Sequence, residues 1–259
     1  MVFVHGTPTW SFLYRAQIRE LSRSHRCIAA DNLGFGLSDK PASFDQHPAR
    51  HADHLQQLLA HLGVTRYTLV VHDFGGPIGL ALALRQPERV CRLVLLNTWL
   101  WATAPDARAR RVDGLLRSWL GRLLYLRFNF SPRVLLRQAL ARPGELSVAV
   151  HRHYLRPFPT PDSRWGLLRL GYQLLGASDW YEEQSRLLPR LRATPALLIW
   201  GRHNAFLGAA LPRWQQLLPE AQTLELPVGH FPQEEAPAEV GQALRRFLAS
   251  PPSHLDNRA

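Results

Sequence analysis

The sequence predicts an α/β fold in which a mostly parallel sheet is flanked by helices and interrupted by one helical insertion. Short apolar runs alternate with longer helical stretches over the first hundred residues, which is the pattern of β–α–β units. Strand signals stop between Trp101 and about Pro189 and resume over residues 196–201. A chain of 259 residues, 46% of them hydrophobic, can bury one large core and carry such an insertion.

The first two expected strands are short and apolar. Residues 2–4 lead directly into His5-Gly6, and residues 26–31 lead into a Gly-rich loop over 32–41. A His-Gly turn after a strand is where one backbone N–H of an oxyanion hole is supplied; the alternative is an ordinary strand-to-helix turn. The Gly34-x-Gly36 pair in the later loop lacks a third glycine that opens a helix, so it does not indicate a dinucleotide site.

The third expected strand carries the most informative feature of the chain. Residues 67–71 run into His72-Asp73-Phe74-Gly75-Gly76 and then into a helical stretch that ends before Pro87. A strand that turns sharply into a helix, with small residues after the turn, is typical of a nucleophile elbow. Asp73 stands at the apex, and a carboxylate can attack saturated carbon directly to form an ester on the enzyme. The alternative is that Asp73 only caps the helix.

Residues 102–189 are predicted to be helical, and the core resumes with the strand over 196–201. The core is therefore expected over 1–101 and 190–250, with a loose tail over 251–259. The alternative for the insertion is a second helical domain with no part in catalysis. The helices expected in it cover residues 112–125, 132–141, 144–154 and 165–175.

A histidine late in the chain completes the candidate site. Residues 224–228 form the last expected strand, and Gly229-His230 follows it. The chain has 12 histidines, most of which are expected on the surface or in the core. The position of His230 after a Gly turn at a strand end suits the order nucleophile, acid, histidine.

Composition narrows the classes of partner. The net charge is +11, but Lys40 is the only lysine and the arginines are scattered, without a basic run, a zinc spacing or another nucleic-acid motif. Cys27 and Cys91 are expected to be reduced core residues of a cytoplasmic protein. The sequence has no signal peptide and no apolar run long enough to span a membrane, so we expect no membrane partner. We also expect a small-molecule substrate and no nucleic acid, metal or cofactor.

Four motifs together resemble the haloalkane dehalogenase-like group of α/β-hydrolases. They occur in the order and at the spacing of that group and cover nearly the whole chain. The motifs are His5-Gly6-Thr7-Pro8-Thr9, Gly36-Leu37-Ser38-Asp39-Lys40-Pro41, Val71-His72-Asp73-Phe74-Gly75-Gly76 and Gly229-His230-Phe231-Pro232-Gln233-Glu234-Glu235-Ala236-Pro237.

The resemblance implies an α/β-hydrolase fold with residues 102–189 as a helical cap over the active site. Asp73 would be the nucleophile, His230 would activate water, and the backbone N–H groups of Thr7 and Phe74 would form the oxyanion hole. The side chains expected to contact substrate are His5, Trp10, Asn97 and Phe206.

The position that should orient His230 is uncharged in this sequence. In residues 200–206 the matching residue is Asn204, and the alternative position, after the strand over 93–96, holds Asn97. An amide oxygen can accept the imidazole N–H but does not stabilise imidazolium, and Asp to Asn in this role costs a serine protease about ten-thousandfold in turnover. Glu234 and Glu235 are close in sequence, but their helix geometry disfavours them. We therefore expect reduced activity.

The leaving-group site also departs from the pattern. Relatives hold a departing halide with a Trp after the nucleophile plus an Asn in the oxyanion loop or a cap Trp, but here the first two positions hold Phe74 and Thr7. Haloalkane hydrolysis is the leading prediction; epoxide hydrolysis, β-lactone opening and a catalytically silent binding protein are the alternatives. The cap residues that could assist are Trp119, Trp165 and Trp180 for a halide, and Tyr125, Tyr154, Tyr172 and Tyr181 for an epoxide oxygen.

The resemblance further implies two strands before residue 2, which we expect to be encoded upstream of Met1. Without them, the strand over 26–30 is expected to be a bare sheet edge.

Overall fold

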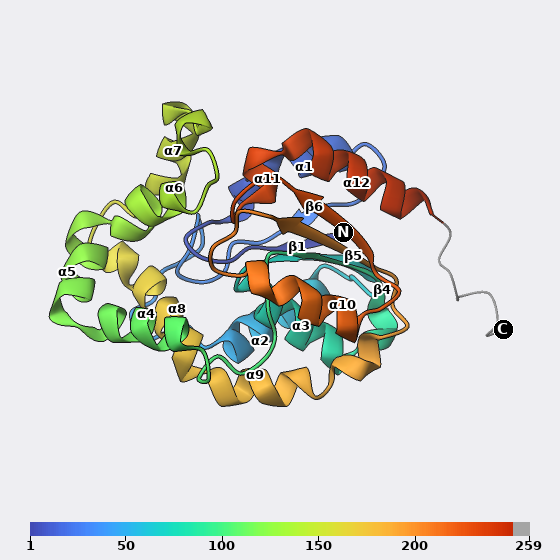
Figure 1. Ribbon diagram of the computed structural model, residues 1–259, viewed down its shortest axis with the longest axis horizontal. Coiled ribbons are helices and arrows are strands. Elements are labelled where there is room, and N and C mark those ends of the chain that lie inside the picture. The colour runs from blue at the N-terminus through green and yellow to red at the C-terminus, as the bar shows by residue number, and fades with distance from the viewer. Residues whose placement is uncertain (251–259) are drawn as a thin grey trace.

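The sheet is six-stranded and entirely parallel in the computed structural model, which describes residues 1–250 (Figure 1). The tail expected over 251–259 lies outside the described residues. The strand order β2-β1-β3-β4-β5-β6 places β3 centrally, next to β1 and β4. The strands are β1 Val2–Val4, β2 Ile28–Ala29, β3 Tyr67–His72, β4 Val90–Leu96, β5 Ala196–Gly201 and β6 Gln222–Leu226. The predicted α/β class is confirmed.

Helices cover both faces of the sheet. Helices α1 and α12 pack together on one face, and α2 and α3 pack together on the other, where α10 also lies (Figure 1). The core helices are α1 Arg15–Leu21, α2 Pro48–His61, α3 Gly75–Arg85, α10 Leu211–Leu217, α11 Pro232–Glu235 and α12 Pro237–Ala249. Every residue of β3 is buried because both faces of this strand are covered.

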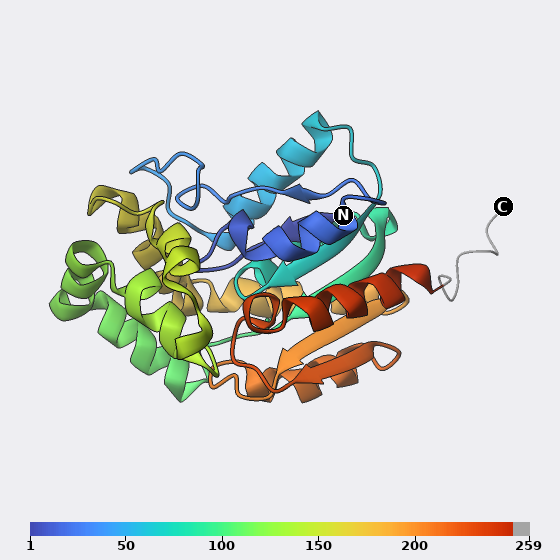
Figure 2. The ribbon, with the colours of Figure 1, turned by 90° about the horizontal axis from the view of Figure 1, so that it is seen from above.

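The insertion between β4 and β5 is helical, as predicted. It lies mainly beyond the carboxyl ends of the strands (Figure 2), the edge at which parallel α/β sheets bind ligands. We call its members the inserted helices: α4 Ala107–Arg117, α5 Trp119–Phe128, α6 Leu136–Gln138, α7 Val148–Leu155, α8 Trp165–Gly176 and α9 Ser178–Ser185.

Three of the four helices predicted in the insertion are wrong in their bounds. The helix expected over 132–141 is a π-helical turn over Ser131–Leu135 followed by the short α6, which ends at Gln138. In the other two, serine is the cause. The single helix expected over 112–125 is two helices, because Ser118 ends α4 and its Oγ accepts the Gly121 N–H at 3.0 Å, which begins α5. Ser147 likewise accepts the Val150 N–H at 3.2 Å and starts α7 later than expected. A serine oxygen satisfies an N–H that has no partner in the first turn. The helix expected over 165–175 is confirmed as α8.

The strand expected over 26–30 is shorter than predicted and lies at the sheet edge. Only Ile28 and Ala29 are in β2, which pairs with β1. In the part of the chain that the structure describes, no helix is both long and apolar enough to cross a membrane.

Candidate active site

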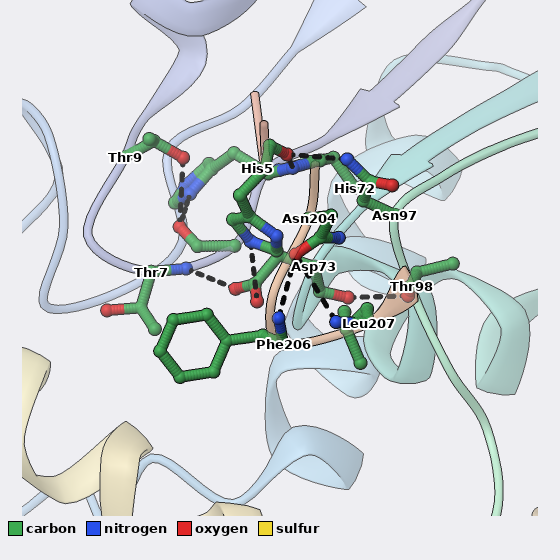
Figure 3. Close-up of polar contacts among 12 residues, drawn as sticks. His5, Thr7, Thr9, His72, Asp73, Asn97, Thr98, Asn204, Phe206 and Leu207 are labelled. Carbon is green, nitrogen blue, oxygen red and sulfur yellow. Dashed lines mark hydrogen bonds and ion pairs between the residues drawn. The ribbon is translucent and has the colours of Figure 1, made fainter. Parts of the chain in front are cut away.

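Asp73 lies at the sharp turn between β3 and α3 (Figure 3). Its φ of +53° is in the left-handed region, which non-glycine residues adopt only where the surroundings impose it. Two neighbours from the end of β4 hold the backbone in this conformation. The Asp73 N–H donates to the Asn97 carbonyl at 3.2 Å, and the Thr98 hydroxyl donates to the Asp73 carbonyl at 2.6 Å.

The carboxylate of Asp73 touches both other parts of the predicted site. One oxygen accepts the Thr7 N–H at 2.8 Å, and the other lies 3.3 Å from Nε2 of His230. The carboxylate comes so close to the chain at Gly6 that a Cβ there would overlap it. Asp73 is largely buried, with 8% of its surface exposed.

Two opposing effects set the protonation of Asp73. Burial raises the pKa of the carboxyl group, but the hydrogen bond and charge of His230, followed by His72 and the Phe74 N–H, lower it by more. The net pKa of Asp73 is below its ordinary value, so the group is an anion in neutral solution. Burial and the neighbouring His230 lower the pKa of His72 to about 3, which keeps that ring neutral.

The loop that carries His230 is fixed by hydrogen bonds to its backbone. The Asn97 amide donates to the carbonyls of Gly229 and His230 at 3.1 and 2.9 Å, and His72 Nε2 also bonds the His230 carbonyl, at 2.8 Å. Glu235 accepts the Gly229 N–H at 2.8 Å and, from the inserted segment, the Ala141 N–H at 2.7 Å. The loop that carries His230 is thus tied to the insertion as well as to the sheet.

The imidazole of His230, in contrast, is held on one side only. Its Nδ1 is buried without a hydrogen-bond partner among the described residues. Asn204 is buried too, but its Oδ1 accepts the backbone N–H groups of Phe206 and Leu207 at 3.1 and 3.3 Å, and its Nδ2 has no partner (Figure 3). The expectation that the Asn204 amide oxygen accepts the imidazole N–H is therefore wrong in this structure, because that oxygen bonds its own loop.

The other carboxyl and amide groups considered for this role are also engaged elsewhere. Asn97 accepts the Gly201 N–H at 3.1 Å with its oxygen, so it braces three chain segments at the sheet end. Glu234 forms a bidentate pair with Arg15 at 2.6 and 2.8 Å and also accepts the Tyr154 hydroxyl. The expectation that neither Glu234 nor Glu235 substitutes for the missing acid agrees with these contacts.

The four residues predicted to contact substrate have different surroundings. Both ring nitrogens of His5 are bonded within the protein, to the Gly6 carbonyl and the Asn32 N–H, and the amide of Asn97 is fully occupied. Trp10 donates its indole N–H to the backbone of α7 at 3.2 Å. Phe206 is 63% exposed, with its ring centre 6.5 Å from that of His230. Substrate contact stays a prediction for all four, and the bonds of His5 and Asn97 indicate that they position backbone.

The three tryptophans predicted as possible halide donors have different surroundings. Trp119 is 77% exposed on α5. Trp165 has the guanidinium groups of Arg122 and Arg169 over its ring, and Trp180 packs edge-on against His47. These contacts place none of the three rings against Asp73.

Sequence inspection missed Thr98 and Trp99, and it did not predict that Glu235 ties the His230 loop to the insertion. Thr98 and Trp99 follow β4, next to β3 in the sheet, and the carboxyl end of the strand adjacent to the one that carries Asp73 is the signal that could have found them. Glu235 bonds Ala141, which is 94 residues away in the chain, and a contact over that separation cannot be predicted from the local sequence. Among residues 1–250 no cluster of three or more His, Cys, Asp or Glu side chains is arranged to hold a metal ion.

Comparison with known proteins identifies the family. The α/β hydrolase fold family matches residues 1–237. Haloalkane dehalogenase 2 of Mycobacterium bovis is 35% identical over 249 residues, which are 94% of this chain and 86% of that protein. The cis-3-alkyl-4-alkyloxetan-2-one decarboxylase of Shewanella oneidensis is 33% identical over 266 residues, covering 96% of this chain and 81% of that one.

Similarity in sequence extends to epoxide hydrolase 3 of Xenopus tropicalis, at 29% identity over 96% of this chain and 71% of that protein. The crystal structure of the haloalkane dehalogenase DatA from Agrobacterium tumefaciens superposes with a TM-score of 0.84 at 27% identity, covering 95% of this chain and 88% of that one. The chain therefore belongs to the α/β-hydrolase fold family. Within that family it is a hydrolase of the haloalkane dehalogenase-like type, which confirms the resemblance inferred from the four motifs.

Proposed function

We propose that this chain hydrolyses carbon–halogen bonds through an ester on Asp73. The observation that carries the proposal is the placement of the Asp73 carboxylate at the strand-to-helix turn, bonded to the Thr7 N–H and 3.3 Å from His230 Nε2. A carboxylate with a lowered pKa is ready to attack without a base.

In the first step, one oxygen of Asp73 forms a bond to the substrate carbon as the halide leaves with the bonding electron pair. In the second, His230 takes a proton from water as the water oxygen attacks the ester carbonyl carbon. The bond from that carbon to the alkoxide oxygen then breaks, His230 returns the proton to release the alcohol, and the Asp73 carboxyl group ionises again. The N–H groups of Thr7 and Phe74 hold the negative charge that develops on the carbonyl oxygen. The Thr7 N–H already bonds Oδ1, the oxygen that would carry this charge if Oδ2 attacks.

The second step is expected to be the slow one. General base catalysis by Nε2 needs the proton on Nδ1, but Nδ1 of His230 has no acceptor in the described structure. Ester formation does not involve His230. The enzyme should therefore accumulate as the ester.

Epoxide hydrolysis is the less favoured alternative, because the leaving alkoxide needs tyrosine hydroxyls to protonate it. The Tyr154 hydroxyl donates to Glu234, and the Tyr181 hydroxyl donates to the Gln173 carbonyl at 2.9 Å. β-Lactone opening by the same nucleophile is the second candidate, and the 33% identity with an oxetanone decarboxylase favours it. The unpaired Nδ1 of His230 is the observation that favours a silent binding protein.

The same proposal includes the domain organisation of the enzyme, its cellular location and its partners. We take residues 102–189 as the cap over Asp73, between core segments 1–101 and 190–250. Activity in the cytoplasm on a small molecule, without nucleic acid, metal or cofactor, stays a prediction.

The test is intact-mass spectrometry after mixing the protein with 1-bromohexane, a 1,2-epoxide or a β-lactone, with bromide release followed in parallel. We expect a burst of bromide and an alkyl adduct on the peptide that contains Asp73. Asp73→Asn should give neither while keeping the wild-type melting curve, and Asp106→Asn, a change on the exposed surface, should retain both. An Asp73→Asn variant that releases bromide at the wild-type rate would contradict the proposal, and an adduct from the lactone alone would favour the second candidate.

A further inference from the structure

Large apolar side chains are exposed on α4 and α5, and α5 lies at one end of the long axis of the molecule (Figure 1). Five of the eight large hydrophobic side chains that are exposed over residues 1–250 fall between 115 and 128. They form what we call the α4–α5 patch: Leu115 (52% exposed), Trp119 (77%), Leu120 (41%), Leu123 (41%) and Phe128 (54%). The two helices are in close contact there, because a Cβ on Gly121 of α5 would overlap the Leu115 carbonyl.

Helix α5 turns an apolar face outwards. Its buried side contains Gly121 and Tyr125, which are four residues apart. Trp119 and Leu123 are also four residues apart, so they are neighbours on the exposed side, and Leu120 lies beside them. A surface helix normally exposes a polar face and buries its apolar one. A group of exposed apolar side chains on a folded protein marks an interaction site.

The patch lies among positive charges. Helices α4 and α5 contain six arginines and one acidic residue, Asp113, which pairs with Arg117 at 2.8 Å. Arg127 lies one turn after Leu123 on the same helix, so basic and apolar side chains share this face. The six arginines, all exposed, are Arg108, Arg110, Arg111, Arg117, Arg122 and Arg127.

The surface of an anionic lipid bilayer is complementary to both properties. Basic side chains are attracted to its phosphate groups, while Trp and Leu side chains enter the boundary between headgroups and acyl chains. A second copy of this chain fits less well, because a symmetric contact through the patch would bring the arginines of the two copies together. A nucleic acid would pair with the arginines but would give the three leucines no apolar partner.

We propose that the α4–α5 patch docks this protein on an anionic lipid surface. Trp119, Leu120 and Leu123 enter the interface, and the surrounding arginines bind lipid phosphates. The helices lie in the interface without crossing it. This proposal departs from our prediction of no membrane partner, which considered only apolar runs long enough to cross a bilayer. It does not rest on the proposed function, since it does not involve Asp73.

The test is flotation of the protein with vesicles of phosphatidylcholine alone and with vesicles of equal parts phosphatidylcholine and phosphatidylglycerol. We expect wild-type protein to bind the anionic vesicles, and binding to weaken as salt is raised. Replacing Trp119 and Leu123 together, by Trp119→Ser and Leu123→Ser, should weaken binding about tenfold or more, because two apolar side chains no longer leave water. Arg127→Gln should weaken it about fivefold, the contribution of one basic side chain near an anionic surface.

Matched controls make the same changes away from the patch. Leu37→Ser alters an 82% exposed leucine in the loop after β2, and Arg66→Gln alters an exposed arginine in the loop before β3. Both variants should bind the vesicles as tightly as wild type. Because every changed side chain is exposed, the variants should keep the wild-type melting curve.

The proposal is overturned if wild-type protein does not bind the anionic vesicles, or if it binds neutral vesicles equally well. It is also overturned if the folded Trp119→Ser, Leu123→Ser variant binds as tightly as wild type. Sedimentation velocity adds a further outcome: a dimer that these two changes dissociate, without vesicle binding by wild type, would assign the patch to a second copy instead.

Discussion

Replacing Asn204 with Asp should restore the missing orientation of His230. The amide oxygen of Asn204 accepts two backbone N–H groups, and a carboxylate oxygen can keep both bonds. The second carboxylate oxygen would replace Nδ2, which has no partner, and would give the buried Nδ1–H of His230 an acceptor. The change therefore converts two unpaired buried atoms into one charge-assisted pair.

The expected gain follows from that pair. A hydrogen bond to a charged group contributes about 1.5–3 kcal/mol, which corresponds to roughly 10- to 100-fold in rate. The carboxylate would also fix the correct tautomer of His230 and stabilise its imidazolium form, which raises the upper limit of the expected rate gain. In a serine protease, replacing the acid in this role lowers turnover about ten-thousandfold. We expect Asn204→Asp to accelerate ester hydrolysis by about two to four orders of magnitude and to leave ester formation within about threefold.

The assay is a chemical-quench single turnover with 1-bromohexane, in which the Asp73 adduct and the alcohol are quantified over time. Asn97→Asp is the control at the other uncharged position. Its carboxylate would face the Gly229 and His230 carbonyls, where the Asn97 amide now donates, so this variant should lose stability and activity. Unchanged ester decay in a folded Asn204→Asp variant would refute the role given to residue 204, and so would equal acceleration of both steps.

Two further changes test a support of the His230 loop and a buried histidine on α2. Glu235→Gln should lower the free energy of unfolding by about 1–3 kcal/mol and slow ester hydrolysis, because the amide has one oxygen to accept the Gly229 and Ala141 N–H groups that two carboxylate oxygens now accept. Urea titration measures the loss, with the exposed Glu239→Gln as the control. A Glu235→Gln variant as stable as wild type would contradict this prediction. Burial lowers the pKa of His51 to about 3, so the unfolded chain binds a proton below pH 6.5 that the folded protein excludes, and stability falls as the pH drops from 6.5 towards 3. His51→Gln should remove about 2 kcal/mol of the wild-type loss of stability between pH 7 and pH 5. Equal pH slopes for His51→Gln and wild type would show that this ring is not kept neutral by folding.

The parts of the site that sequence predicted are those fixed by local geometry. A buried strand, a small-residue turn and a helix placed Asp73 correctly at the end of β3, and a strand followed by Gly229 placed the His230 loop beside it. The inserted helices were found from their composition, but their ends at Ser118 and Ser147 were not, because serine caps compete with helix continuation only through local hydrogen bonds.

What sequence could not supply are the contacts between distant segments. Whether the Asn204 side-chain oxygen faces His230 or its own loop depends on the backbone conformation after β5. In the structure this oxygen accepts hydrogen bonds from two N–H groups of its own loop. Trp99 was one of eight tryptophans, and only its burial, its unpaired N–H and its packing on Phe74 distinguish it. A missing partner is a property of the folded neighbourhood, so no motif records it.

The central claim is that carbon is transferred to Asp73 before water attacks, and one isotope measurement tests it most directly. A single turnover is run in water enriched in oxygen-18 with enzyme in excess over 1-bromohexane. Because water attacks the ester carbonyl carbon, the alcohol should contain ordinary oxygen, and digestion should show one heavy oxygen in the carboxylate of Asp73. Heavy oxygen in the alcohol with none on Asp73 would mean that water displaces the halide directly and would contradict the account.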